Sequence, residues 1–251
     1  MMRKLLKHDI RDSYMEIVIF CGLLIFASLL IMLAVRTASG FFIFISGFAY
    51  FAAAAILAVV LIRIIIQNFH VKMFTNIGYL TLTTPVSTDK LLLSKIIVSM
   101  LWQTVVVIAF ILSILIMIGS ADLMGNFLRG FIRLFVDFPA QSIMVCLLIL
   151  SFSLTSIMTL LLVLAIINKG KSKRYKVLKG ILIYYGLNQA IGSFVAVLLV
   201  WIIFPLSSGN NLSPLAFFYI ITGTLLVAFL GISVGFYFLS RHIIIKKIEL
   251  E

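Results

Sequence analysis

The chain has 251 residues, of which 63% are hydrophobic and 11% are charged, and its mean hydropathy is +1.26. Soluble globular proteins are about 45–50% apolar and about 25% charged, so this composition excludes an ordinary soluble domain and indicates a polytopic membrane protein. The formal net charge of +12 does not indicate a nucleic-acid partner, because the basic residues lie between apolar runs and form no stripe with interleaved aromatic residues.

Residues 1–14, MMRKLLKHDIRDSY, carry Leu5, Leu6 and Ile10 among charges of both signs. This pattern predicts a short interfacial helix on the membrane surface, with a disordered basic tail as the alternative. The next apolar run, Ile17–Val35, exceeds the hydrophobic region of a signal peptide, which has about 7–15 residues, and it is followed by Arg36. We therefore expect a first membrane span that is retained.

Six apolar runs have a length suited to crossing a bilayer, which takes about 20 residues. They predict an all-α polytopic membrane protein with six transmembrane helices. No internal repeat or low-complexity linker divides the chain, so a single transmembrane domain over residues 1–251 is expected. The runs are Ile17–Val35, Phe41–Ile66, Ile96–Ile118, Ser142–Ile167, Gly180–Phe204 and Leu215–Leu239.

The positions of lysine and arginine predict the orientation of the spans. All but three of the 20 basic residues lie before the first span, near the connections after the second and fourth spans, or after the last span. The exceptions are Arg36, Arg129 and Arg133. Segments rich in lysine and arginine stay in the cytoplasm. Both termini and the connection between spans two and three are therefore expected to be cytoplasmic, in a multi-pass protein of the cell membrane.

The connection between the second and third spans, residues 67–95, has an amphipathic pattern of its own. Phe69, Met73 and Ile77 recur at every fourth position and Phe74 lies beside them, which predicts a short helix with an apolar ridge. This apolar ridge (Phe69, Met73, Phe74 and Ile77) would be unfavourable in water. It must contact either lipid headgroups or a protein partner.

The limits of this short helix are also marked in the sequence. Polar residues fill the side opposite the apolar ridge, namely Gln67, His70, Lys72 and Asn76. Gly78 follows the helical pattern, and glycine is the residue that most easily adopts the conformation that ends a helix. Ser87 or Thr88, followed by Asp89, then predicts the capped start of the next helix.

The outer connection at residues 120–140 carries a second apolar stripe. Phe127, Phe131 and Phe135 lie at helical spacing, and the arginines of this segment face elsewhere. The pattern predicts an interfacial helix on the outer leaflet. It is compatible with an anchor, a gate or a guide for the transported molecule, and the anchor is the simplest of the three.

Polar and small residues within the spans are candidate sites in the bilayer core. An amide without partners in hydrocarbon costs several kcal/mol, so such residues indicate interhelical hydrogen bonds, a transport pathway or a subunit contact. Glycines spaced by four let helices approach closely, within one chain or between two. The candidates for a pathway or subunit interface are Gln103, Tyr184, Asn188, Gln189, Gly231 and Gly235. For Ser151, Thr155 and Thr159 we favour interhelical hydrogen bonds.

The sequence predicts no catalytic, metal or cofactor site in this chain. The acidic residues lie outside the apolar runs or at their borders, and all three histidines are in predicted cytoplasmic segments, which disfavours an ion-coupled transporter. The stretch Ala165–Ser172, AIINKGKS, imitates a phosphate-binding loop. However, alanine stands at the first glycine position and the stretch follows a membrane span rather than a strand.

One segment resembles a known family. Gly78–Leu82 (GYLTL), Thr84–Ser87 (TPVS) and Leu91–Lys95 (LLLSK) resemble a pattern in the membrane-spanning permease subunits of bacterial type-2 ABC exporters. In that family the pattern also lies between the second and third spans. The ending Phe236–Glu251, in which a last span runs into a short basic tail, is similar to the family as well.

The resemblance implies that the amphipathic segment is a coupling helix, which docks in a groove of a separate ATPase subunit. That subunit would bind ATP and magnesium, and two permease copies, identical or different, would assemble with two ATPases. The residues implied in ATPase coupling are Phe69, Lys72, Met73, Phe74, Asn76, Ile77, Gly78 and Tyr79.

The family transports lipids, glycans, drugs and peptides. A pathway without buried charge suits an amphipathic or hydrophobic cargo, either a peptide or a drug-like molecule. Two other classes of function are kept open at this point. One is an autonomous secondary transporter, and the other is a non-transporting membrane scaffold or immunity protein.

Overall fold

The computed structural model describes residues 2–37, 39–71, 88–118, 130, 133, 135–169, 176–209 and 213–248. The described residues are helical almost throughout and contain no strand, which confirms the all-α prediction. Within these residues, six helices are long and apolar enough to cross a membrane, so the chain is a multi-pass membrane protein. It divides into two compact units, Met1–Asp137 and Phe138–Glu251. The single domain stays a prediction.

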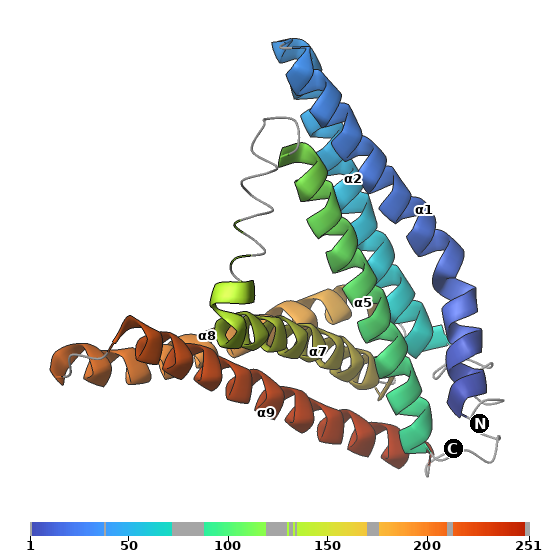
Figure 1. Ribbon diagram of the computed structural model, residues 1–251. Helices are drawn as coiled ribbons and strands as arrows, with labels where there is room; N and C mark the ends of the chain where they lie inside the picture. The colour runs from blue at the N-terminus through green and yellow to red at the C-terminus, as the bar shows by residue number, and fades with distance from the viewer. Residues whose placement is uncertain are drawn as a thin grey trace. The chain divides into compact units, whose positions relative to one another are not determined.

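Unit 1 contains three long helices, α1 (Met2–Arg36), α2 (Gly40–Ile66) and α5 (Thr88–Ile118). A short π-helix, η1 (Gln67–Val71), continues α2. The helix α1 packs along both α2 and α5, whereas α2 and α5 contact each other less. Within this unit α1 and α5 run in the same direction and α2 runs against them (Figure 1).

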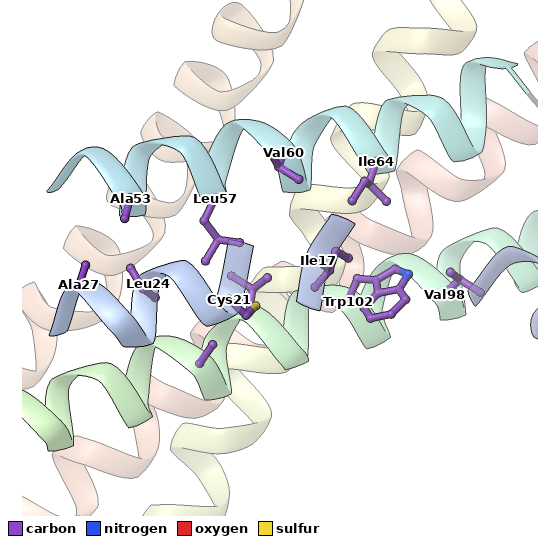
Figure 2. Packing of buried hydrophobic residues seen from close by; sticks show 12 residues of the cluster. Ile17, Cys21, Leu24, Ala27, Ala53, Leu57, Val60, Ile64, Val98 and Trp102 are labelled. Carbon is purple, nitrogen blue, oxygen red and sulfur yellow. The ribbon is translucent and has the colours of Figure 1, made fainter. Parts of the chain in front are cut away.

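The core of unit 1 is one cluster of apolar side chains from all three helices. Its members recur at intervals of three and four residues along each helix, so they form one stripe per helix. Figure 2 shows these side chains directed toward one another between the helices. The cluster consists of Ile17, Cys21, Leu24, Ala27, Ala53, Leu57, Val60, Ile64, Val98, Trp102, Val106 and Ala109.

The helix α1 begins well before the first apolar run. Residues 2–14 form its first turns without a break, where we expected a separate helix. Leu6 and Ile10 pack against the core cluster, and Asp9 and Ser13 are buried. The segment continues the span because its apolar and charged side chains both find contacts within unit 1. Its position relative to the membrane surface stays a prediction.

Unit 2 also contains three long helices, α7 (Pro139–Lys169), α8 (Lys176–Gly209) and α9 (Pro214–Ile248). The helix α7 packs mainly on α9 and less on α8, and α8 and α9 contact each other little. The apolar span of α8 is Val177–Ile203, and no residue is buried in the most apolar stretch of that span. In α7, half of the most apolar stretch is buried. Unit 2 is therefore built around the α7–α9 pair.

Local sequence signals explain where several helices begin. Both α7 and α9 start at a proline, Pro139 and Pro214, and proline suits a first helical turn because the N–H that it lacks would have no partner there. Ser213 precedes α9 and its Oγ accepts a hydrogen bond of 3.3 Å from the backbone N–H of Ala216, as an N-cap does. The helix α5 starts at Thr88, within the predicted start, and Ser87, the other predicted capping residue, lies outside the described residues.

The predicted outer helix at residues 120–140 lies mostly outside the described residues. The structure describes Gly130, Arg133 and residues 135–140 of this range, and α7 begins at Pro139. An interfacial helix there stays a prediction.

The core cluster of unit 1 generates a first prediction. Leu57 is 0% exposed and lies between all three helices, whereas its neighbour Ile56 is 46% exposed. Leu57→Ala removes packing contacts and leaves a cavity, so it should lower the free energy of unfolding by about 2–5 kcal/mol. Ile56 faces away from the core, so Ile56→Ala should lower the free energy of unfolding by much less. Denaturant unfolding of the purified protein in detergent measures both. Equal losses would contradict the position of the core.

Candidate functional site

The structure describes both ends of the 67–95 segment but not its middle. The π-helix η1 ends at Val71, and α5 starts at Thr88. Most of the predicted ATPase-coupling residues therefore lie outside the described residues, and their roles stay predictions. These residues are Lys72, Met73, Phe74, Asn76, Ile77, Gly78 and Tyr79.

Phe69 is the one predicted coupling residue that the structure describes. Its side chain is 1% exposed, in a π-helix that contacts both α2 and α5. The amphipathic pattern placed Phe69 on an apolar ridge free to meet a partner. In the structure its ring packs within unit 1 instead, because the interior of the bundle offers apolar contacts directly beside the end of α2. Phe69 therefore contributes to packing in this conformation.

A buried ion pair joins α1 to α5 close to these ends. The Nζ atom of Lys95 donates a hydrogen bond to Oδ2 of Asp9, 86 positions away in the sequence. The two side chains are only 5% and 4% exposed. Removing one partner of a buried pair costs about 3–5 kcal/mol, because the other charge is left uncompensated in a dry site. The pair therefore requires α1 and α5 to keep their relative position here.

Two further contacts in unit 1, one ion pair and one contact between a histidine and a carboxylate, are exposed and weaker. Nη2 of Arg63 lies 3.9 Å from Oε1 of Glu16, and the two side chains are 60% and 41% exposed. Nδ1 of His8 lies 3.2 Å from Oδ2 of Asp12, one helical turn further along α1. Exposed pairs of this kind contribute about 0–1 kcal/mol. We call the region with Asp9, Lys95, Glu16 and Arg63 the charged end of unit 1. Its buried pair, and not its exposed pairs, determines its geometry.

One trio of potential metal ligands falls at the same place. The ligand atoms of His8, Asp9 and Asp12 lie within 4.8 Å of one another. Asp9 already accepts the bond from Lys95, and the other two residues are exposed on the surface of α1. The trio is best explained by the ion pairs in which its members take part.

Several buried polar atoms near the charged end have no hydrogen-bond partner among the described residues. They are Nδ2 of Asn68 in η1 and, on one side of α5, Oγ of Ser99, Nε1 of Trp102 and Oε1 of Gln103. Gln103 was a predicted pathway or interface residue, and the structure places it half-buried on α5. Buried polar groups of this kind are normally satisfied by water or by a further protein group. This end of unit 1 is therefore polar inside.

The predicted site residues of the fifth span lie on the surface of unit 2. Asn188 and Gln189 are exposed and Tyr184 is half-buried. Nδ2 of Asn188 donates a hydrogen bond of 2.9 Å to the carbonyl of Tyr184 within the same helix. Two adjacent amides in the middle of a span are unfavourable against lipid. Unit 2 by itself leaves both of these amide side chains exposed.

The predicted glycine pair of the sixth span also lies on the surface of unit 2. A Cβ atom added at Gly231 or Gly235 would meet no described atom within 4 Å, and the same is true at Gly186 in α8. Close helix approach within unit 2 occurs instead at Gly180, where a Cβ would lie 2.7 Å from Cδ1 of Ile167 in α7. A single glycine gives no repeating signal in the sequence, so pattern analysis did not single it out.

The hydroxyl groups of the fourth span confirm the predicted interhelical bond at one position. Oγ1 of Thr155 donates to the carbonyl of Phe229 in α9 at 3.1 Å and also lies 2.8 Å from the carbonyl of Ser151. The hydroxyls of Ser151 and Thr159 bond to carbonyls of their own helix. All three side chains are buried. These residues therefore belong to the packing of α7.

Comparison with known protein families, with curated proteins and with solved structures gives no match. The functional conclusion therefore depends on the residues themselves. Among the described residues, the polar groups to be explained are the buried ones near η1 and the exposed amides of α8.

The bond between Thr155 and Phe229 generates a second prediction. Thr155→Val keeps the shape of the side chain but removes the interhelical bond, so it should lower the stability of unit 2 by about 0.6 kcal/mol and by no more than about 1.7 kcal/mol. Thr224 is the matched control, because its hydroxyl bonds only to carbonyls of its own helix, those of Ile220 and Ile221, among the described residues. Detergent unfolding of Thr155→Val and Thr224→Val compares the two, and an equal effect would contradict the assignment.

Proposed function

We propose that this chain is the membrane-spanning permease subunit of an ATP-driven exporter of the type-2 ABC class, with ATP hydrolysed by a separate ATPase subunit. The observation that carries the proposal is the segment from Gly78 to Lys95, whose GYLTL, TPVS and LLLSK elements resemble that family. The segment connects the second and third of six membrane-spanning helices, which is its place in the family.

The distribution of charge supports an orientation with this segment in the cytoplasm. All but three of the 20 lysine and arginine residues lie on the side that includes both termini and residues 67–95. An excess of basic residues marks the cytoplasmic side of a membrane protein. An ATPase that takes ATP from the cytoplasm would find the segment on its own side of the membrane.

The surface of unit 2 supports assembly with a second permease. Asn188 and Gln189 are exposed near the middle of α8, and Gly231 and Gly235 leave a smooth surface on α9. Amide side chains carry both donors and acceptors, so they can satisfy one another across an interface between two copies. Small residues let the backbones of such helices approach.

The cargo is proposed to be amphipathic or hydrophobic, either a peptide or a drug-like molecule. The spans of unit 2 carry amide, hydroxyl and aromatic groups, and their charged residues lie toward the helix ends. A charged cargo would need compensating charge within the membrane. A neutral or amphipathic molecule would not.

The coupling role generates a third prediction. Met73→Asp combined with Phe74→Asp places two carboxylates on the predicted apolar ridge, which should abolish docking of the ATPase while membrane insertion is retained. We expect co-purification of the ATPase from native membrane to fall about tenfold or more, because burying an uncompensated charge at an interface costs several kcal/mol. ATP-dependent export by the complex should be lost as well.

The matched control for this experiment is Gln67→Asp combined with His70→Asp, which adds the same charge to the polar side of the predicted helix. It should retain the ATPase. Unchanged co-purification and export in the Met73 and Phe74 variant would refute the coupling role. If no ATPase accompanies the unmodified chain, the exporter proposal itself fails.

The orientation generates a fourth prediction. In a background with Cys21→Ala and Cys146→Ala, a cysteine at Asn211 should react with a membrane-impermeant maleimide applied to intact cells. A cysteine at Ser172 should react only after the cells are permeabilised, because its basic segment is predicted to be cytoplasmic. The reverse labelling pattern would overturn the orientation and the coupling role with it.

A further inference from the structure

The charged end of unit 1 connects three separate parts of the chain. Asp9 of α1 is bound to Lys95 of α5, and η1, which ends α2, packs against both α2 and α5. Residues 72–87 run from the end of η1 to the start of α5. Any displacement of that segment therefore acts on η1 and on the first turns of α5, and α5 is joined to α1 by the ion pair.

The ion pair differs physically from the other α1–α5 contacts. Further along, the two helices meet through apolar side chains such as Leu24, Val98 and Val106, whose attraction is non-directional. Apolar surfaces can slide over a fraction of a helical turn while they stay in contact. The pair of Asp9 and Lys95 has a fixed geometry, and sliding would separate two charges that have almost no access to water. It therefore sets the axial position of α1 against α5.

The ion pair restricts the relative position of α1 and α5 more than stability alone requires. Replacing a buried ion pair by well-packed apolar residues is often neutral or stabilising, so an apolar pair here would hold the helices together equally well. What an apolar pair would not supply is a single permitted axial position. This difference separates a positioning role from a purely structural role, and it can be measured.

We propose that the Asp9–Lys95 pair transmits displacement of η1 and of the first turns of α5 to α1, so that the first turns of α1 belong to the energy-coupling apparatus. The proposal rests on the proposed function to the extent that the displacement comes from a partner ATPase. Asp9 and Lys95 are positioning residues in this mechanism. They contact neither the cargo nor the nucleotide, and they make α1, α5 and η1 move together.

The first test uses the purified full-length chain without any ATPase. Hydrogen exchange is followed at the backbone amides of residues 6–13 in α1 and of Gln67–Val71 in η1. Asp9→Asn should raise exchange about tenfold or more in both regions and less in unit 2, because it removes the carboxylate charge that binds Lys95 across the two helices. The swap of Asp9→Lys with Lys95→Asp should restore protection. Glu16→Gln, which removes an exposed pair on the same helix, should behave as the unmodified chain.

Two results of this test would overturn the proposal. One is faster exchange confined to α1, which would show that the pair does not act on η1. The other is equally faster exchange in all six spans, which would show a loss of global stability only. Failure of the charge swap to restore protection, while the swapped chain remains folded, would count against the pair in the same way.

The second test uses the complex with its ATPase. Asp9→Leu combined with Lys95→Met replaces the pair with apolar side chains, and we expect normal thermal stability and normal co-purification of the ATPase. Export per ATP hydrolysed should fall about tenfold, because α1 is no longer held at one axial position. Normal export by this stable variant would overturn the proposal. If the unmodified chain binds no ATPase, the exporter function fails, and the exchange experiment alone decides the role of the pair.

Discussion

The buried pair of Asp9 and Lys95 is the interaction on which the arrangement of unit 1 depends. It fixes where α1 and α5 lie along each other, and the apolar stripes of the two helices then meet in one register. The hydrogen bond between the hydroxyls of Tyr50 and Ser113, at 2.9 Å, ties α2 to α5 far from the charged end. Polar contacts at two positions along the helices thus align a bundle whose other contacts are apolar. Such alignment matters in a membrane because lipid makes apolar contacts with a helix as readily as another helix does.

The two units satisfy their polar residues in different ways. Unit 1 turns Asp9, Lys95, Asn68 and Ser99 inward and leaves mainly apolar residues on its outer surface. Unit 2 joins α7 to α9 but leaves α8 with its amides exposed. A helix with the lowest hydropathy of the six and no burial in the most apolar part of its span is poorly suited to face lipid on all sides. In the proposed exporter, a second copy of the chain would cover this surface.

The sequence was sufficient to predict the six spans, because runs of about 20 apolar residues carry an unambiguous signal. It did not predict where α1 begins, because the charged residues between positions 2 and 14 are typical of a surface segment. Only the structure shows that Lys95 lies beside Asp9. No local pattern relates two residues 86 positions apart. Phe69 shows the same limit. Its spacing indicated an apolar side of a helix, but periodicity does not reveal whether that side meets a partner or the protein's own interior. The coupling residues from Lys72 to Tyr79 lie outside the described residues, so their roles remain those that the sequence suggests.

The division of the chain between Asp137 and Phe138 has a consequence for how the protein is made. In the orientation that the lysine and arginine residues predict, the three spans of residues 1–137 would leave the start of unit 2 on the outer side of the membrane. A gene encoding residues 138–251 alone would then have to export its own amino terminus. The orientation of unit 2 would therefore depend on the prior synthesis of residues 1–137.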